Sequence, residues 1–169
     1  MKKHIFIING SGGSGKDTFC NLIKEYSGLN TYIISSVDVI KEKAKTMGWD
    51  GISKTEKDRK FLSDLKDLCT WYNDAPFEYI SEKIDYFNAA INKDIMFIHI
   101  REPKEIDKVK RKYPDVKTLL ITNKNVPLIK SNSGDAGVFN YDYEYCVKND
   151  GTLDDLKITA LEFVERVCR

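Results

Sequence analysis

The sequence of 169 residues predicts an α/β domain, in which about five parallel strands form one sheet with helices on both faces. Two observations support this prediction. Short apolar runs alternate along the chain with longer amphipathic segments, as in consecutive strand–helix–strand units. The apolar runs are also continuous, which is typical of strands buried on both faces of a parallel sheet. We therefore expect one domain that covers residues 1–169.

The first elements are a strand, a glycine-rich loop and a helix. Residues 5–8 are a continuous apolar run, and residues 18–26 carry apolar side chains at helical spacing. A second strand is expected at residues 31–35. It leads to Asp38 and a lysine-rich helix that ends near Gly48.

Further helices follow without a strand between them. Residues 55–73 and residues 77–91 both have helical periodicity, and Pro76 between them is expected to separate the two helices. Residues 53–91 therefore predict a helical insertion in the alternating pattern.

The second half of the chain returns to alternation. Strands are expected at residues 95–100, 116–122 and 143–148, and Pro103 opens a charged amphipathic helix that reaches Tyr113.

The last helix has a clear start signal, and a long polar segment stands before the last strand. Thr152 and Asp155 have the spacing of a capping box, so the helix is expected to run from there to Val167. Residues 123–142 are polar and contain glycine. A connection of this length in a compact domain is usually a lid or a disordered segment, and we expect a lid.

The composition argues against several classes of partner. The net charge is +1, from 27 basic and 26 acidic residues that are dispersed along the chain, so we expect no binding to nucleic acid or to a membrane surface. No stretch is apolar enough to span a bilayer, and the short apolar run at the start lacks a cleavage site. Reduced thiols in a cytoplasmic protein are expected, because four cysteines are scattered without a C-x-x-C pair.

Residues 10–18, "GSGGSGKDT", match two phosphate-binding patterns. Gly10, Gly12 and Gly15 satisfy G-x-G-x-x-G, the turn that binds dinucleotides. Gly10 and Gly15 with Lys16 satisfy G-x-x-x-x-G-K, the phosphate loop of nucleoside triphosphate-binding proteins. In both cases backbone N–H groups at the start of a helix would face the phosphates.

Lys16 favours the second pattern. A triphosphate needs a cation beside its β- and γ-oxygens, whereas a dinucleotide turn needs close backbone approach and no ammonium group. The dinucleotide alternative stays open, because Asp38 lies roughly where an acidic residue would bind the ribose. The residues expected to bind ATP in this loop are Gly10, Ser11, Gly12, Gly13, Ser14, Gly15, Lys16, Asp17 and Thr18.

Asp17 stands where this pattern normally has serine or threonine as a magnesium ligand. A carboxylate can also hold hydrated Mg²⁺, so Asp17 is a candidate magnesium ligand. It could equally serve only to complement the positive end of the helix dipole.

With "GKDT" the chain resembles the nucleoside monophosphate kinase branch of phosphate-loop proteins, most closely the phage-type deoxynucleoside monophosphate kinases. The resemblance extends to "GWDG" at residues 48–51, to Arg59 with the "LSDL" that follows it, to "IREPKEI" at residues 100–106 and to "VKNDGTLDDL" at residues 147–156. The glycine loop that ends in "GKDT" is specific for phosphate binding, and the other motifs support the kinase branch only as a set.

The resemblance implies the P-loop NTPase fold, ATP and Mg²⁺ as cofactors, and small nucleotide substrates as partners. Residues 53–91 would then bind the acceptor. Lys16 would stabilise the transferred charge, and Arg101 and Arg59 would hold the acceptor phosphate, because a guanidinium pairs two phosphate oxygens at once. The turn formed by Asn149, Asp150 and Gly151 is expected beside the loop, where its backbone could bind adenine.

Two departures from the family pattern keep other functions open. His99 stands where related kinases commonly carry an aspartate, and it is expected to be a satisfied buried histidine. The lid segment contains Lys124 and Lys130 but no arginine. The alternatives are a kinase of another small phosphorylated compound, a regulatory module that binds ATP without transfer, and a dinucleotide-dependent oxidoreductase. Aromatic residues that could stack on a base are more simply explained as core, namely Trp49, Trp71 and Tyr72.

Overall fold

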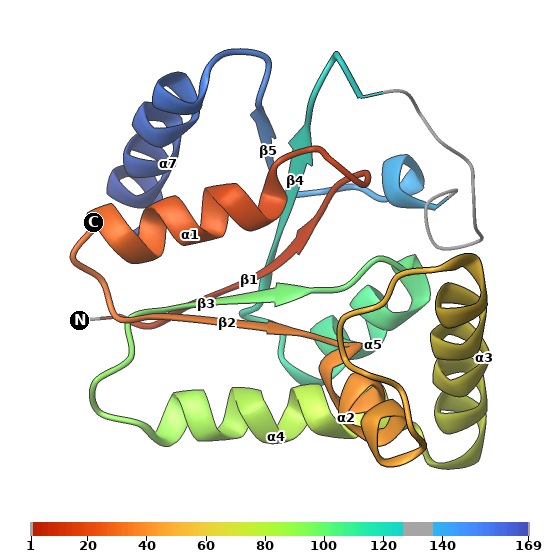
Figure 1. Cartoon of the computed structure of the whole chain (residues 1–169). Coiled ribbons are helices and arrows are strands. Elements are labelled where there is room, and N and C mark those ends of the chain that lie inside the picture. The colour runs from red at the N-terminus through yellow and green to blue at the C-terminus, as the bar shows by residue number, and fades with distance from the viewer. Residues whose placement is uncertain (1, 127–136, 169) are drawn as a thin grey trace.

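The computed structural model describes residues 2–126 and 137–168. Five parallel strands form one sheet in the order β2-β3-β1-β4-β5, which confirms the predicted fold class (Figure 1). The order places β1, the strand before the glycine loop, at the centre of the sheet. The strands are β1 (His4–Asn9), β2 (Thr31–Ser35), β3 (Ile95–His99), β4 (Lys117–Thr122) and β5 (Tyr145–Lys148).

Helices cover both faces of the sheet, as predicted. Successive residues of a strand point to opposite faces, so Phe6 and Ile8 pack under one helical layer and Ile7 packs under the other. Figure 1 shows α1 (Lys16–Tyr26) with α7 (Leu153–Cys168) on the first face, and α4 (Ala75–Ala89) with α5 (Pro103–Lys112) on the second. Within the described part of the chain, no helix combines the length and the apolar character that a membrane span needs.

The predicted helix start before α7 is confirmed. Thr152 Oγ1 accepts a hydrogen bond from Asp155 N at 3.2 Å, and the Asp155 carboxylate accepts one from Thr152 N at 2.7 Å. The same reciprocal pair occurs at the start of α3, between Thr55 and Asp58. Both helices therefore begin where their capping residues satisfy N–H groups that have no partner inside the helix.

The helical insertion differs from expectation in how it divides. Pro76 does not separate the two helices, because it lies in the first turn of α4, where a missing N–H costs nothing. The break is at Asp74, which has φ of 52°. α4 packs into the core against the sheet through Ile80, Ile84 and Phe87. Only α3 and the loop before it stand outside the core.

α2 (Asp38–Thr46) and α3 (Glu56–Asn73) contact each other beside the sheet. α3 has no buried residue. The expectation that Trp71 and Tyr72 belong to the core is wrong, since these side chains are 79% and 78% exposed. Ion pairs join α3 and its C-terminal cap to the segment around α5: Lys66 pairs with Glu102, and Asp74 pairs with Lys108 at 2.8 Å.

Candidate active site

The glycine loop connects β1 to α1 at the carboxyl edge of the sheet. Gly15 precedes the first helical residue and has φ of 91°, which favours glycine. A Cβ atom at Gly15 would lie 2.3 Å from Asn149 Nδ2. Asn149 in turn donates a hydrogen bond from Nδ2 to the carbonyl oxygen of Ser14, at 3.0 Å. The turn after β5 therefore lies against the loop, as the sequence predicts.

Asn9 joins three segments at this edge. Its side chain is fully buried, its Oδ1 accepts from Gly10 N at 2.8 Å, and its Nδ2 donates to the carbonyl oxygen of Arg101 at 3.0 Å and to Tyr143 Oη at 2.8 Å. Burial raises the pKa of Tyr143 to about 12, so its hydroxyl is protonated at neutral pH. Asn9 is not among the site residues expected from the sequence, although a polar residue at the end of an apolar strand could have indicated it.

A cavity of about 290 Å³ lies on one side of the loop. Asp150, from the predicted turn, lines it and accepts a hydrogen bond from Lys124 N at 2.8 Å. Phe139, which the sequence analysis missed, brings an aromatic ring that is 44% exposed. We refer to this space as the base pocket; it is lined by Ser11, Ser14, Ile121, Thr122, Asn123, Lys124, Val126, Phe139, Lys148 and Asp150.

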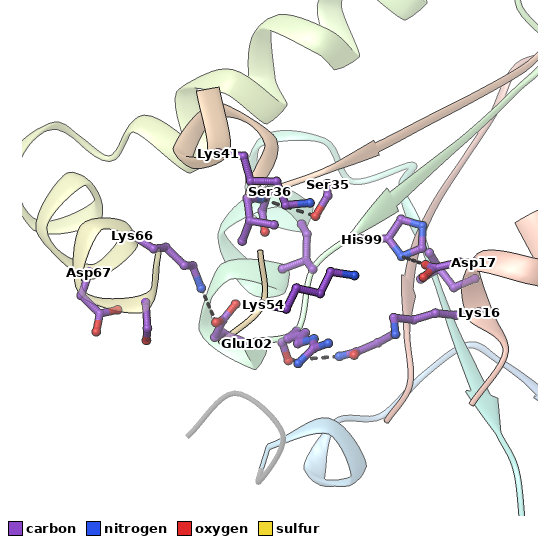
Figure 2. Close-up of a pocket in the computed structure, with 16 residues that line it drawn as sticks. Lys16, Asp17, Ser35, Ser36, Lys41, Lys54, Lys66, Asp67, His99 and Glu102 are labelled. Atoms are coloured by element: carbon purple, nitrogen blue, oxygen red, sulfur yellow. Dashed lines mark hydrogen bonds and ion pairs between the residues drawn. The ribbon is translucent and has the colours of Figure 1, made fainter. Parts of the chain in front are cut away.

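A larger cleft of about 480 Å³ lies on the other side of the loop. Figure 2 shows its charged side chains converging from α1, α2, α3 and the end of β3. We refer to it as the charged cleft; its lining residues are Ile8, Asn9, Lys16, Asp17, Ser35, Ser36, Val37, Lys41, Lys54, Ser63, Lys66, Asp67, His99, Ile100, Arg101 and Glu102.

The structure brings together two of the three expected catalytic residues. Lys16 and Arg101 both line the charged cleft. Arg59 is exposed on α3 and does not line it. Arg59 nevertheless lies one helical turn before Ser63, a lining residue, and so it shares the face of α3 that carries the lining side chains.

Three further lysines line the cleft that sequence reasoning did not single out. Lys41 lies on α2, Lys54 in the loop before α3, and Lys66 on α3. With Lys16 and Arg101 they outnumber the carboxylates of the lining, Asp17, Asp67 and Glu102. The cleft is therefore suited to an anionic ligand.

His99 faces the start of α1 and lines the charged cleft. Its Nδ1 lies 3.5 Å from the Asp17 carboxylate (Figure 2). Burial lowers the pKa of His99, although the Asp17 carboxylate acts in the opposite direction. A lowered pKa makes the imidazole neutral at neutral pH. His99 is thus a largely buried histidine, as expected, but one that contacts Asp17 in the first turn of α1.

Asp17 is the candidate metal ligand, and its carboxylate suits Mg²⁺. The side chain is 79% exposed and lines the charged cleft beside Lys16. The described residues contain no group of three or more His, Cys, Asp or Glu side chains that could enclose a metal ion. Hydrated Mg²⁺ does not need such a group, since it takes one or two carboxylates together with phosphate oxygens and water.

The remaining predicted residues have simpler positions. Thr18 is exposed in the first turn of α1, and Gly151 lies beside Asp155 at the start of α7. Asp38, the residue that kept the dinucleotide alternative open, accepts a hydrogen bond from Ser35 N at 2.7 Å, which gives it a local structural role. Of the expected lid, residues 127–136, including Lys130, lie outside the described residues.

Comparisons with known proteins find a similar fold in several solved structures. Neither a protein-family model nor a curated protein matches the chain. A gluconokinase from Sinorhizobium meliloti 1021 matches with a TM-score of 0.51 and 16% identity, over 99% of this chain and 95% of that one. The thymidylate kinase from Candida albicans matches with a TM-score of 0.51 and 13% identity, over 98% and 92%.

TT1252 from Thermus thermophilus matches with a TM-score of 0.52 and 18% identity, over 98% of this chain and 99% of that one. At these identities the likeness establishes the fold. The chain has the fold of phosphate-loop kinases over nearly its whole length, which confirms the fold expected from the sequence.

Proposed function

We propose that this protein is a kinase that transfers the γ-phosphoryl group of ATP to a small phosphorylated acceptor. The sequence resemblance favours a nucleoside or deoxynucleoside monophosphate as that acceptor. One observation carries the proposal: the phosphate loop separates a small pocket with an aromatic ring from a larger cleft rich in cations. This is the layout that a donor nucleotide and an anionic acceptor require.

The donor would lie across the loop. Adenine would occupy the base pocket, with Phe139 and the turn at Asp150 beside it, and the triphosphate would follow the N–H groups of residues 10–15 toward α1. Lys16 begins α1 at the entrance to the charged cleft, so its ammonium group would neutralise negative charge on the transferred phosphoryl.

Mg²⁺ would be held by Asp17 together with phosphate oxygens of ATP. When bound, the ion would neutralise negative charge on the phosphates of ATP. His99, neutral and next to Asp17, would limit the positions that this carboxylate can adopt.

The acceptor would enter the charged cleft with its phosphate toward Lys16. Arg101 would orient that phosphate so that one oxygen forms a bond to the γ-phosphorus while the bond to the bridging β-γ oxygen breaks. ADP leaves with that bridging oxygen, and a dianionic acceptor phosphate needs no base to remove a proton. Arg59 would reach the cleft only if α3 moves toward the loop, since its side chain lies outside the lining here.

The regulatory-module alternative is less well supported by this geometry. A module that only holds ATP needs the loop and the base pocket, but it has no use for lysines and an arginine brought to one cleft from separate elements. The oxidoreductase alternative is disfavoured by Lys16 at the helix start and by the local role of Asp38.

The test is ADP release from ATP and Mg²⁺, measured alone and with a panel of phosphorylated acceptors. We expect ADP release to rise by at least ten-fold with one or more acceptors. Titration with ATP and with NADH is the matched binding measurement, and only ATP is expected to bind. ATP binding without any acceptor-dependent ADP release would favour the regulatory module instead.

A further inference from the structure

We propose that the acceptor site recognises a phosphate group on a hydroxylated carrier and makes no stacking contact with a nucleobase. Within this site, Lys54 binds the acceptor phosphate. This inference rests on the proposed function and specifies its acceptor. It means that a sugar phosphate without a base should be phosphorylated about as well as a nucleotide.

The two cavities differ in the side chains they offer a ligand. The base pocket contains the Phe139 ring. The charged cleft offers lysines, carboxylates and the hydroxyls of Ser35, Ser36 and Ser63. Among the described residues that line it, the one ring is the His99 imidazole, which is largely buried and faces Asp17. The undescribed positions, residues 1, 127–136 and 169, include no Phe, Tyr or Trp in the sequence.

These groups match the parts of a sugar phosphate. Ammonium groups bind phosphate oxygens, and serine hydroxyls and carboxylates hydrogen-bond to hydroxyl groups of a carrier. A nucleobase in the same cleft would gain little from stacking. Stacking on aromatic side chains is a main source of binding energy for a base whose edges are not hydrogen-bonded.

Lys54 is the lysine of this cleft best placed to bind an incoming anion. Its side chain is exposed, and it has no hydrogen bond or ion pair with another described residue. Figure 2 shows it extending across the cleft toward the side that carries Lys16 and His99. Lys66, by contrast, is paired with Glu102, and Lys41 lies 3.9 Å from Asp38.

The loop that carries Lys54 has a defined shape. Asp50 Oδ1 accepts hydrogen bonds from Ile52 N and Ser53 N, both at 2.8 Å, and Trp49 Nε1 donates to the Ser53 carbonyl oxygen at 3.2 Å. These bonds fix the backbone immediately before Lys54. The backbone of Lys54 is therefore held in place beside the cleft, while its flexible side chain can adjust to the phosphate.

The first experiment compares acceptors by kcat/KM at saturating ATP and Mg²⁺. Ribose 5-phosphate and 2-deoxyribose 5-phosphate are compared with the ribo- and deoxyribonucleoside monophosphates. We expect the better sugar phosphate to lie within five-fold of the best nucleotide, because five-fold is about the least that stacking on one base contributes. A nucleotide preference above five-fold overturns the inference and leaves the proposed kinase function intact.

The second experiment tests Lys54. Lys54→Gln should raise the KM for the acceptor at least ten-fold without changing ATP affinity, and by the same factor for a sugar phosphate and a nucleotide. Lys54→Arg should restore most of the loss. Lys57→Gln is the matched control, since Lys57 is an exposed lysine of the same region that does not line the cleft. Equal effects of Lys54→Gln and Lys57→Gln overturn the assignment.

Failure of the proposed function can be distinguished from failure of this inference. If no acceptor raises ADP release although ATP binds, the proposed function fails and this inference falls with it. If acceptors are phosphorylated but Lys54→Gln behaves as the control does, only the inference fails.

Discussion

The two sides of the glycine-rich loop differ in how firmly their helices are packed. On the proposed donor side, α1 and α7 pack on the sheet through fully or almost fully buried aromatic side chains such as Phe19 and Phe163. On the proposed acceptor side, α3 has no fully buried residue; it contacts α2 and α4 and is joined to the segment around α5 by ion pairs. Partly exposed ion pairs contribute little stability. The proposed donor side is therefore the more firmly packed of the two, and we expect α3 on the proposed acceptor side to move more easily.

The largest expected effect is on the free energy of unfolding, which should depend on α7 much more than on α3. Phe163→Ala should lower the free energy of unfolding by about 3–5 kcal/mol, because it removes a buried aromatic side chain and leaves a cavity. Trp71→Ala, on the outer face of α3, should change it by less than about 0.5 kcal/mol. Urea denaturation of both variants measures the difference. A comparable loss in Trp71→Ala would mean that α3 is packed as firmly as α7.

The next effect concerns the chemistry of the donor side. Lys16→Ala should lower kcat by about 10²–10³, because one charge-stabilising group at the transferred phosphoryl is removed. The melting temperature without nucleotide should stay unchanged, since Lys16 lies at the surface of the charged cleft and not in the core. Unchanged turnover would contradict the assignment of the loop.

A smaller effect tests how firmly the loop is preformed. Gly15→Ala puts a Cβ atom 2.3 Å from Asn149 Nδ2 in a backbone with φ of 91°. Gly28→Ala is the matched control, because Gly28 has φ of 74° but no neighbour within 4 Å of a Cβ atom. Both substitutions should lower the free energy of unfolding by about 1–2 kcal/mol through backbone strain. Gly15→Ala should lower it by about 1 kcal/mol more and should weaken ATP binding, because it breaks the contact with Asn149.

The smallest effect should appear on the acceptor side. Arg101→Lys keeps the charge but loses the two-pronged pairing with a phosphate, so the KM for the acceptor should rise about ten-fold while ATP affinity is unchanged. Arg111→Lys, an exposed substitution on α5, serves as the control. A change in ATP affinity instead would place Arg101 on the donor, and the contrast between the two sides would need revision.

The fold was almost fully predictable, because its signals are local. Continuous apolar runs, helical periodicity and capping pairs such as Thr152 with Asp155 depend on residues close together in the chain, and the structure confirms the elements they predict. The glycine pattern with Lys16 likewise located the loop at the start of α1. Pro76 shows the limit, since the same residue that can end a helix is also favoured in the first turn of one.

What the sequence alone determined is the order of strands and helices and the place of the glycine-rich loop at the start of α1. Only the tertiary structure decided which side chains share a cavity. Asn9 reaches Arg101 and Tyr143 across more than ninety residues of chain, and Lys54 and Phe139 come to opposite sides of the loop. Parallel strands bring their carboxyl ends to one edge of the sheet, so residues far apart in sequence meet there. No local sequence pattern predicts which of the many lysines in the chain lie at that edge.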